Sequence, residues 1–205
     1  MIKNFLKIFS YILHPVFIPS MATGCYFLIA KGFFTDFEIQ LSLFHSVLLT
    51  LLLPICIYFL LRSMKLISSS IMVEKREERA TPIFLNIILI GILVFFIWKY
   101  NRGYDLKHFF VTYMISYGLA FTSVLAKKKY SIHLLSFSAA ALFIIKTSID
   151  YHQPIIISLS LLVLLLGCLM SSRIAIKAHT FLELFMGILI GILPQLVLWN
   201  TVLPL

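Results

Sequence analysis

The sequence predicts an all-α protein, a polytopic transmembrane bundle of six to seven spans with no soluble domain of any size. Of its 205 residues, 61% are hydrophobic and 12% are charged, whereas an ordinary soluble domain is about 45–50% apolar and about 25% charged. The apolar residues fall in stretches close to the roughly 20 residues that a helix needs to cross a bilayer. Only short polar loops separate these stretches, so residues 1–205 are expected to form one integral membrane domain.

The first apolar stretch, residues 12–31, is the weakest, because His14, Pro15 and Pro19 interrupt it. Basic residues precede it, but it contains no convincing small-residue cleavage site, which argues against a cleavable signal peptide. We expect residues 1–34 to form either a weak first span or an interfacial segment.

The six later stretches are stronger candidates for membrane spans. Pro82 opens one of them, and proline is favourable in the first turn of a helix. Three consecutive lysines, residues 127–129, end the next span. The six predicted spans cover residues 39–61, 82–98, 108–126, 132–147, 154–170 and 180–199.

Composition also bears on cofactors and partners. Cys25, Cys56 and Cys168 each lie in an apolar stretch and have no metal-ligand spacing, so neither a disulfide nor a zinc site is expected. The net charge is +9, but the basic residues sit in loops at span ends. That placement is typical of a topology signal, of contacts with anionic lipid headgroups or of a phosphate-bearing substrate. We expect membrane lipids as partners, and no nucleic acid, metal or cofactor.

Three polar clusters carry the candidate chemistry, and the span order puts all three on the N-terminal side of the membrane. In the last cluster, His179 and Glu183 are four residues apart and therefore share one face of a helix. A carboxylate there can bind one imidazole nitrogen and leave the other as a nucleophile or a base. The clusters span residues 74–82, 129–133 and 172–183.

The surrounding residues complete a candidate phosphoryl-transfer site. Arg173 can bind two anionic oxygens with its guanidinium fork, and His133 can protonate a leaving oxygen. Lys75, Arg76 and Arg79 add enough positive charge to hold a phosphate dianion.

These residues resemble the type 2 phosphatidic acid phosphatase superfamily. Ser172-Arg173, five residues, His179, three residues, Glu183, three residues and Gly187 match its third motif, SRxxxxxHxxxD with a following glycine, except for glutamate in place of aspartate. Ser131-Ile132-His133 keeps the serine and histidine of the second motif, PSGH. The run that ends at Pro82 is loosely similar to the first motif, KxxxxxxRP. The resemblance covers a core at about residues 62–200.

The resemblance implies a metal-independent lipid phosphatase that hydrolyses a phosphomonoester or diphosphate through a phosphohistidine. It makes His179 the nucleophile, Glu183 the residue that orients it, and His133 the general acid. Phosphate oxygens would be bound by the basic residues and by the serine of the second motif: Arg173, Arg79, Lys75 and Ser131.

Other readings of the same residues remain open. The site could pass its phosphate to another acceptor, as a lipid phosphotransferase, or bind or transport lipids without catalysis. The charge runs at residues 74–79 and 127–129 are also typical of topology anchors. The remaining ionisable residues that fit no constellation are interpreted as interfacial: His14, His45, His108, His152 and Asp150.

Orientation is predicted differently by charge and by resemblance. Twelve of the 17 Lys and Arg residues fall on the N-terminal side, which the positive-inside rule assigns to the cytoplasm. The resemblance instead implies an extracytoplasmic active face in a bacterial inner membrane.

Overall fold

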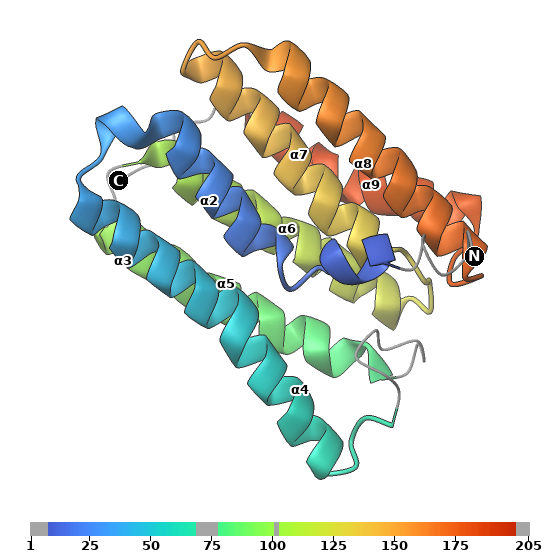
Figure 1. Ribbon diagram of the computed structural model, residues 1–205. Helices are drawn as coiled ribbons and strands as arrows, with labels where there is room; N and C mark the ends of the chain where they lie inside the picture. Colours follow the sequence, from blue (N-terminus) through green and yellow to red (C-terminus); the bar gives the residue numbers. More distant parts are fainter. Residues whose placement is uncertain (1–7, 69–77, 101–102, 200–205) are drawn as a thin grey trace.

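The protein is a bundle of helices packed side by side (Figure 1). The computed structural model describes residues 8–68, 78–100 and 103–199, and these ranges hold helices and no strand. Its long elements are α2 (Ile18–Ala30), α3 (Asp36–Val47), α4 (Leu53–Ser63), α5 (Ala80–Tyr100), α6 (Tyr104–Leu125), α7 (Ile132–Asp150), α8 (Ile155–Ala175) and α9 (Phe181–Val197).

Five helical segments in these ranges are long and apolar enough to cross a membrane, so the chain is an integral membrane protein. They are Asp36–Ser63, Ala80–Ile97, Tyr104–Leu125, Ile132–Asp150 and Ile155–Ala175. Five of the predicted spans are thus confirmed, whereas the full count of six to seven is not. The apolar helix α9 has 17 residues and α2 has 13, and both are shorter than a typical span.

The first of these segments is one continuous helix with a wider turn at its centre. A π-helical turn, Leu48–Leu52, joins α3 to α4 immediately before Pro54. Proline has no backbone N–H, so it cannot donate to the carbonyl four residues earlier, and the turn adjusts around that gap. At this turn the Thr50 hydroxyl also donates to the Ser46 carbonyl, at 2.7 Å.

The N-terminal stretch is broken where its prolines predict. A short helical segment ends near Leu13, and α2 begins at Ile18 with Pro19 in its first turn, where a missing N–H costs nothing. From there α2 packs against α7 and α3. Its residue Tyr26 is fully buried and stacks on Phe143 of α7, with ring centroids 5.7 Å apart.

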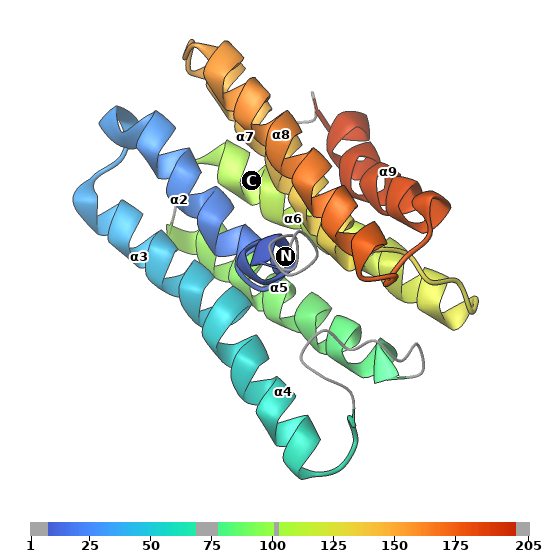
Figure 2. The ribbon, with the colours of Figure 1, turned by 45° about the vertical axis from the view of Figure 1, so that its right-hand side comes forward.

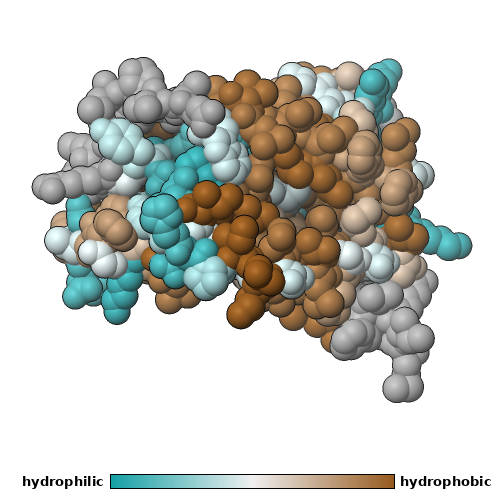
Figure 3. All heavy atoms as spheres, turned by 90° about the horizontal axis from the view of Figure 1, so that it is seen from above, coloured by the Kyte–Doolittle hydropathy of each residue, from teal (hydrophilic) through white to brown (hydrophobic). Residues whose placement is uncertain are grey.

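Helix α7 forms the centre of the bundle, and α8 lies at its periphery. Most of α7 is buried, between α2, α6, α8 and α9, whereas little of α8 is buried. The exposed side chains of α8 include Ile156, Ile157, Val163 and Leu164. Figure 3 shows the resulting apolar belt across the molecule, with hydrophilic residues gathered toward its ends. In a chain with five membrane-crossing helices, this belt faces lipid.

Two glycines let α9 approach α7 closely. A Cβ added at Gly187 would lie 2.6 Å from the Ser131 carbonyl oxygen, and one at Gly191 would clash with the Leu135 carbonyl. Small residues spaced in this way allow helix backbones to come together in membranes. The GxxxG pattern therefore serves packing within this chain, next to the segment that carries His133.

Replacing Gly187 by alanine is expected to destabilise the protein by about 1–3 kcal/mol, because the new methyl group meets backbone that cannot move aside easily. The check is the melting temperature of the detergent-solubilised protein. Gly167→Ala in α8 is the matched control, since an added Cβ there has no atom within 4 Å. Equal melting temperatures for the two variants would contradict the close α7–α9 packing.

Candidate functional site

A cavity lined by both polar and apolar side chains lies where α5, α7 and α9 begin and α8 ends. Its volume is about 110 Å³, well above the roughly 10–15 Å³ that one water needs. Figure 2 follows the short connection from α8 to α9, which carries one of the lining histidines. The basic and amide side chains that line the cavity come from four separate parts of the sequence: His14, Arg79, Asn86, His133, Arg173 and His179.

His179 is held by a carboxylate of the following helix. Its Nδ1 lies 2.9 Å from Oε2 of Glu183. A carboxylate accepts, so Nδ1 carries the proton and Nε2 is left unprotonated. The predicted pairing of these two side chains is thus present, and His179 is buried at the cavity wall.

A capping box at the start of α9 fixes the Glu183 carboxylate. The backbone N–H of Thr180 donates to Glu183 Oε2 at 3.1 Å, and the N–H of Glu183 donates to Thr180 Oγ1 at 3.3 Å. This reciprocal pair is typical of glutamate three residues after a capping threonine. The same carboxylate oxygen therefore caps the helix and orients His179, and the extra methylene of glutamate suits both tasks.

Two arginines supply the charge of the cavity. Arg173, in the last turn of α8, is 2% exposed, and Arg79, just before α5, is 6% exposed. No Asp or Glu is among the described residues that line the cavity. Both guanidinium groups border one small volume, and a guanidinium fork matches the geometry of phosphate oxygens.

His133 completes the predicted core of the site. It lies in the first turn of α7 and is 5% exposed. Its Nε2 is buried and has no hydrogen-bond partner among the described residues. His133, His179, Arg79 and Arg173 were all predicted as site residues, and the fold brings the four together.

Three other residues of the predicted clusters are placed differently. Ser131 is fully buried, and its hydroxyl accepts from Leu134 N–H as the N-cap of α7, outside the cavity lining. Lys75 lies outside the described residues. Lys129 donates to the Ala178 carbonyl at 3.0 Å, so one of the expected anchor lysines braces the loop that carries His179.

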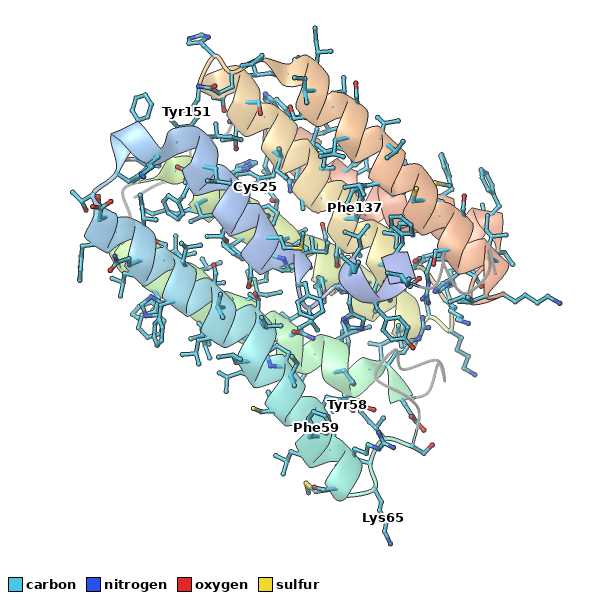
Figure 4. All side chains as sticks on the ribbon, in the orientation of Figure 1. Cys25, Tyr58, Phe59, Lys65, Phe137 and Tyr151 are labelled. Carbon is cyan, nitrogen blue, oxygen red and sulfur yellow. The ribbon has the colours of Figure 1, made fainter. Side chains whose placement is uncertain are left out.

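Several lining residues had no signal in the sequence. Tyr58 lies on the side of α4 that faces α5 (Figure 4), and Asn86 and Tyr117 line the same cavity. His14 was interpreted as interfacial, yet it also lines the cavity. Its position beside Pro15 was the one available hint, because proline breaks the helix there and turns the chain toward the site.

The site keeps His179 in its neutral form. Burial, and then the positive charges of Arg173, Arg79 and Lys129, lower the pKa of His179 from 6.5 to about 3. At neutral pH the imidazole is therefore unprotonated at Nε2, which is the form that a nucleophile requires.

The lowered pKa of His179 predicts a pH-dependent stability. The unfolded imidazole binds a proton near pH 6.5 and the folded one near pH 3, so between these values the unfolded state binds more protons and the free energy of unfolding falls as the pH falls. Its contribution is fully present above pH 6.5. Wild type should lose stability between pH 6.5 and 4.5 more steeply than His179→Gln, by up to about 1.4 kcal/mol per pH unit. Melting temperatures measured across this range test it, and parallel curves would contradict the shift.

The described residues contain no group of three or more His, Cys, Asp or Glu side chains placed to hold a metal ion. Compared with protein-family models, with curated proteins and with solved structures, the chain matches none of them. Its function is therefore inferred from the chemistry of the cavity.

Proposed function

We propose that the protein is a membrane-embedded lipid phosphatase that works through a phosphohistidine at His179. The observation that carries the proposal is the convergence of four buried side chains on one small cavity: His179, His133, Arg79 and Arg173. These are the parts that phosphoryl transfer requires: a neutral nucleophile, a proton donor in reach and fixed positive charge around the transferred group.

The proposed reaction has two steps. Nε2 of His179 attacks phosphorus, the P–O bond to the leaving group breaks, and His133, protonated while the anionic phosphate is bound, gives its proton to the leaving oxygen. Water then attacks the phosphohistidine, loses a proton to His133 and releases inorganic phosphate, which restores both rings. Glu183 holds the ring of His179 in place, and Arg79 and Arg173 stabilise the charge on the phosphoryl oxygens.

An apolar pocket beside the cavity supports a lipid as the substrate. A narrower apolar pocket between α4 and α5 shares Tyr58, Pro82 and Asn86 with the charged cavity. Beyond these shared residues it is lined by Pro54, Ile57, Leu61, Leu85 and Leu89. A lipid whose phosphate occupies the cavity could therefore place its hydrocarbon tail between these two helices.

The proposal also covers location. We place the protein in a bacterial inner membrane with the cavity on the extracytoplasmic face, because the charge count of 12 against 5 includes residues of the candidate clusters. Without Lys75, Arg76, Arg79, Arg173 and Lys177 it is 7 against 5. A membrane-impermeant thiol probe on intact cells tests this with two exposed positions at opposite ends of the bundle. Lys128→Cys should be labelled and His152→Cys should not. The reverse pattern would place the site in the cytoplasm.

The function is tested by phosphate release from the purified protein in detergent with a chelator. The panel holds phosphatidic acid, phosphatidylglycerol phosphate, undecaprenyl diphosphate and a phosphorylated lipid A. The proposal predicts metal-independent release from at least one of them. Binding of these lipids without any release would indicate a lipid-binding or transport protein, and transfer of the phosphate to an added alcohol in preference to water would indicate a phosphotransferase.

A further inference from the structure

A larger groove lies between α2 and α3, at the other end of α2 from the candidate site. The two helices lie side by side and are joined by the short 3-10 helix Lys31–Phe33 (Figure 1). The groove has a volume of about 450 Å³. Its lining positions recur every three or four residues along each helix, so one face of each helix forms a wall. They are Gly24, Phe27, Leu28 and Lys31 along α2 and its C-cap, and Asp36, Ile39, Gln40 and Leu43 along α3.

The groove is charged at its mouth and apolar further in. Asp36 is the first residue of a membrane-crossing segment, and Lys31 follows the last residue of α2, so both lie at the level of the lipid headgroups. From there the walls lead past Phe27 and Ile39 toward Gly24. Lys31 and Gly24 are seven residues apart, which is about 10 Å along a helix. This division matches an amphiphile with a charged end and a hydrocarbon chain.

The two charges at the mouth have opposite signs. Lys31 and Asp36 are both exposed, and neither side chain forms an ion pair within the described residues. The capping box that starts α3 uses Thr35 and Glu38 instead, so the fold leaves both charges to the groove. An ethanolamine phospholipid carries the complementary pair, because its phosphate is an anion and its primary ammonium donates N–H bonds. A choline headgroup has no N–H donor, and a phosphoglycerol headgroup has no cation.

We propose that this groove binds an ethanolamine phospholipid, with Lys31 on the phosphate, Asp36 on the ammonium and one acyl chain extending to Gly24. Space for the chain is present, since a Cβ added at Gly24 would have no atom within 4 Å. The site lies in the leaflet opposite to the candidate phosphatase cavity. It therefore stands whether or not the chain hydrolyses a lipid at the other end.

The headgroup is tested by native mass spectrometry of the full-length, detergent-solubilised protein. The lipids are an equimolar mixture of phosphatidylethanolamine, phosphatidylglycerol and phosphatidylcholine with identical acyl chains. Wild type should retain phosphatidylethanolamine about 5-fold more than either of the others, which is the scale of two exposed charge contacts. Asp36→Asn removes the acceptor charge and should reduce the preference over phosphatidylglycerol to about 2-fold or less.

The acyl chain is tested by filling the groove. Gly24→Leu places a side chain where the hydrocarbon would lie, and it should lower the retained phosphatidylethanolamine by about 5-fold. Gly167→Leu in α8 is the matched control, because an added Cβ there also meets no atom within 4 Å and the position is exposed. This control should retain lipid as wild type does.

Three results would overturn the inference. Equal retention of the three lipids by wild type would make the groove an ordinary lipid-facing surface, and a preference for phosphatidylglycerol would show that Asp36 has no role in binding. A phosphatidylethanolamine preference that is unchanged in Asp36→Asn and in Gly24→Leu would place the lipid elsewhere. If the melting temperature shows that Gly24→Leu does not fold, the result for Asp36→Asn, at an exposed position, decides alone.

Discussion

His179→Ala is expected to lower phosphate release by about 1,000-fold or more, because the variant removes the group that forms the covalent bond to phosphorus. The neutral ring has its Nε2 available across the physiological pH range, given a pKa of about 3, and among the described residues its position against Glu183 is not duplicated by another imidazole. The measurement is the initial rate of phosphate release on the best lipid of the panel.

A measurement of lipid phosphate binding distinguishes loss of catalysis from loss of substrate binding. Arg79 and Arg173 are untouched in His179→Ala, so the variant should bind the lipid phosphate within a few-fold of wild type. His152→Gln, an exposed histidine far from the cavity, should keep full activity. An active His179→Ala would show that the ring is not the nucleophile, whatever else binds in the cavity.

Arg173→Lys is expected to lower kcat/KM by about 100-fold although the charge is kept. Arg173 is among the largest fully buried side chains and lies at the cavity wall. Lysine supplies one point charge in place of a planar fork, so it cannot hold two phosphoryl oxygens at once as their charge grows. Loss of one such preorganised donor typically costs about 100-fold or more in rate.

The control for Arg173 is a cation on the same face that does not line the cavity. Lys128 is exposed in the loop between α6 and α7, and Lys128→Ala should retain wild-type kcat/KM. If both variants lose activity equally at low salt and recover at high salt, general surface charge would explain the effect, and the specific role of Arg173 would be wrong.

The parts of the structure that local sequence determines were predicted well. Five spans follow from stretches of apolar residues, and the His179–Glu183 pair follows from a spacing of four on one helix face. The capping box was also encoded locally, because a threonine three residues before a glutamate, here Thr180 and Glu183, is its sequence pattern. Glutamate at this position is thereby explained by the helix start.

The parts that depend on packing between distant segments were not predictable. His14 reaches the cavity because Ser10 bonds Ser172, across 162 positions of the sequence, and no local pattern encodes that contact. Tyr58 and Asn86 lie in helices whose periodicity shows only that they are apolar on most sides. The hydroxyl of Ser131 caps α7, so its role in phosphate binding stays a prediction, as does the catalytic role of the site.

The measurement that tests the central claim most directly is the search for a phosphohistidine. The protein is mixed with its radiolabelled lipid phosphate, quenched in alkaline denaturant within milliseconds to seconds, and digested for mass spectrometry. The account predicts an acid-labile, alkali-stable phosphoryl group on His179 that is absent from His179→Ala. Turnover of the lipid by wild type without any label on His179, or with the label on another residue, would contradict it.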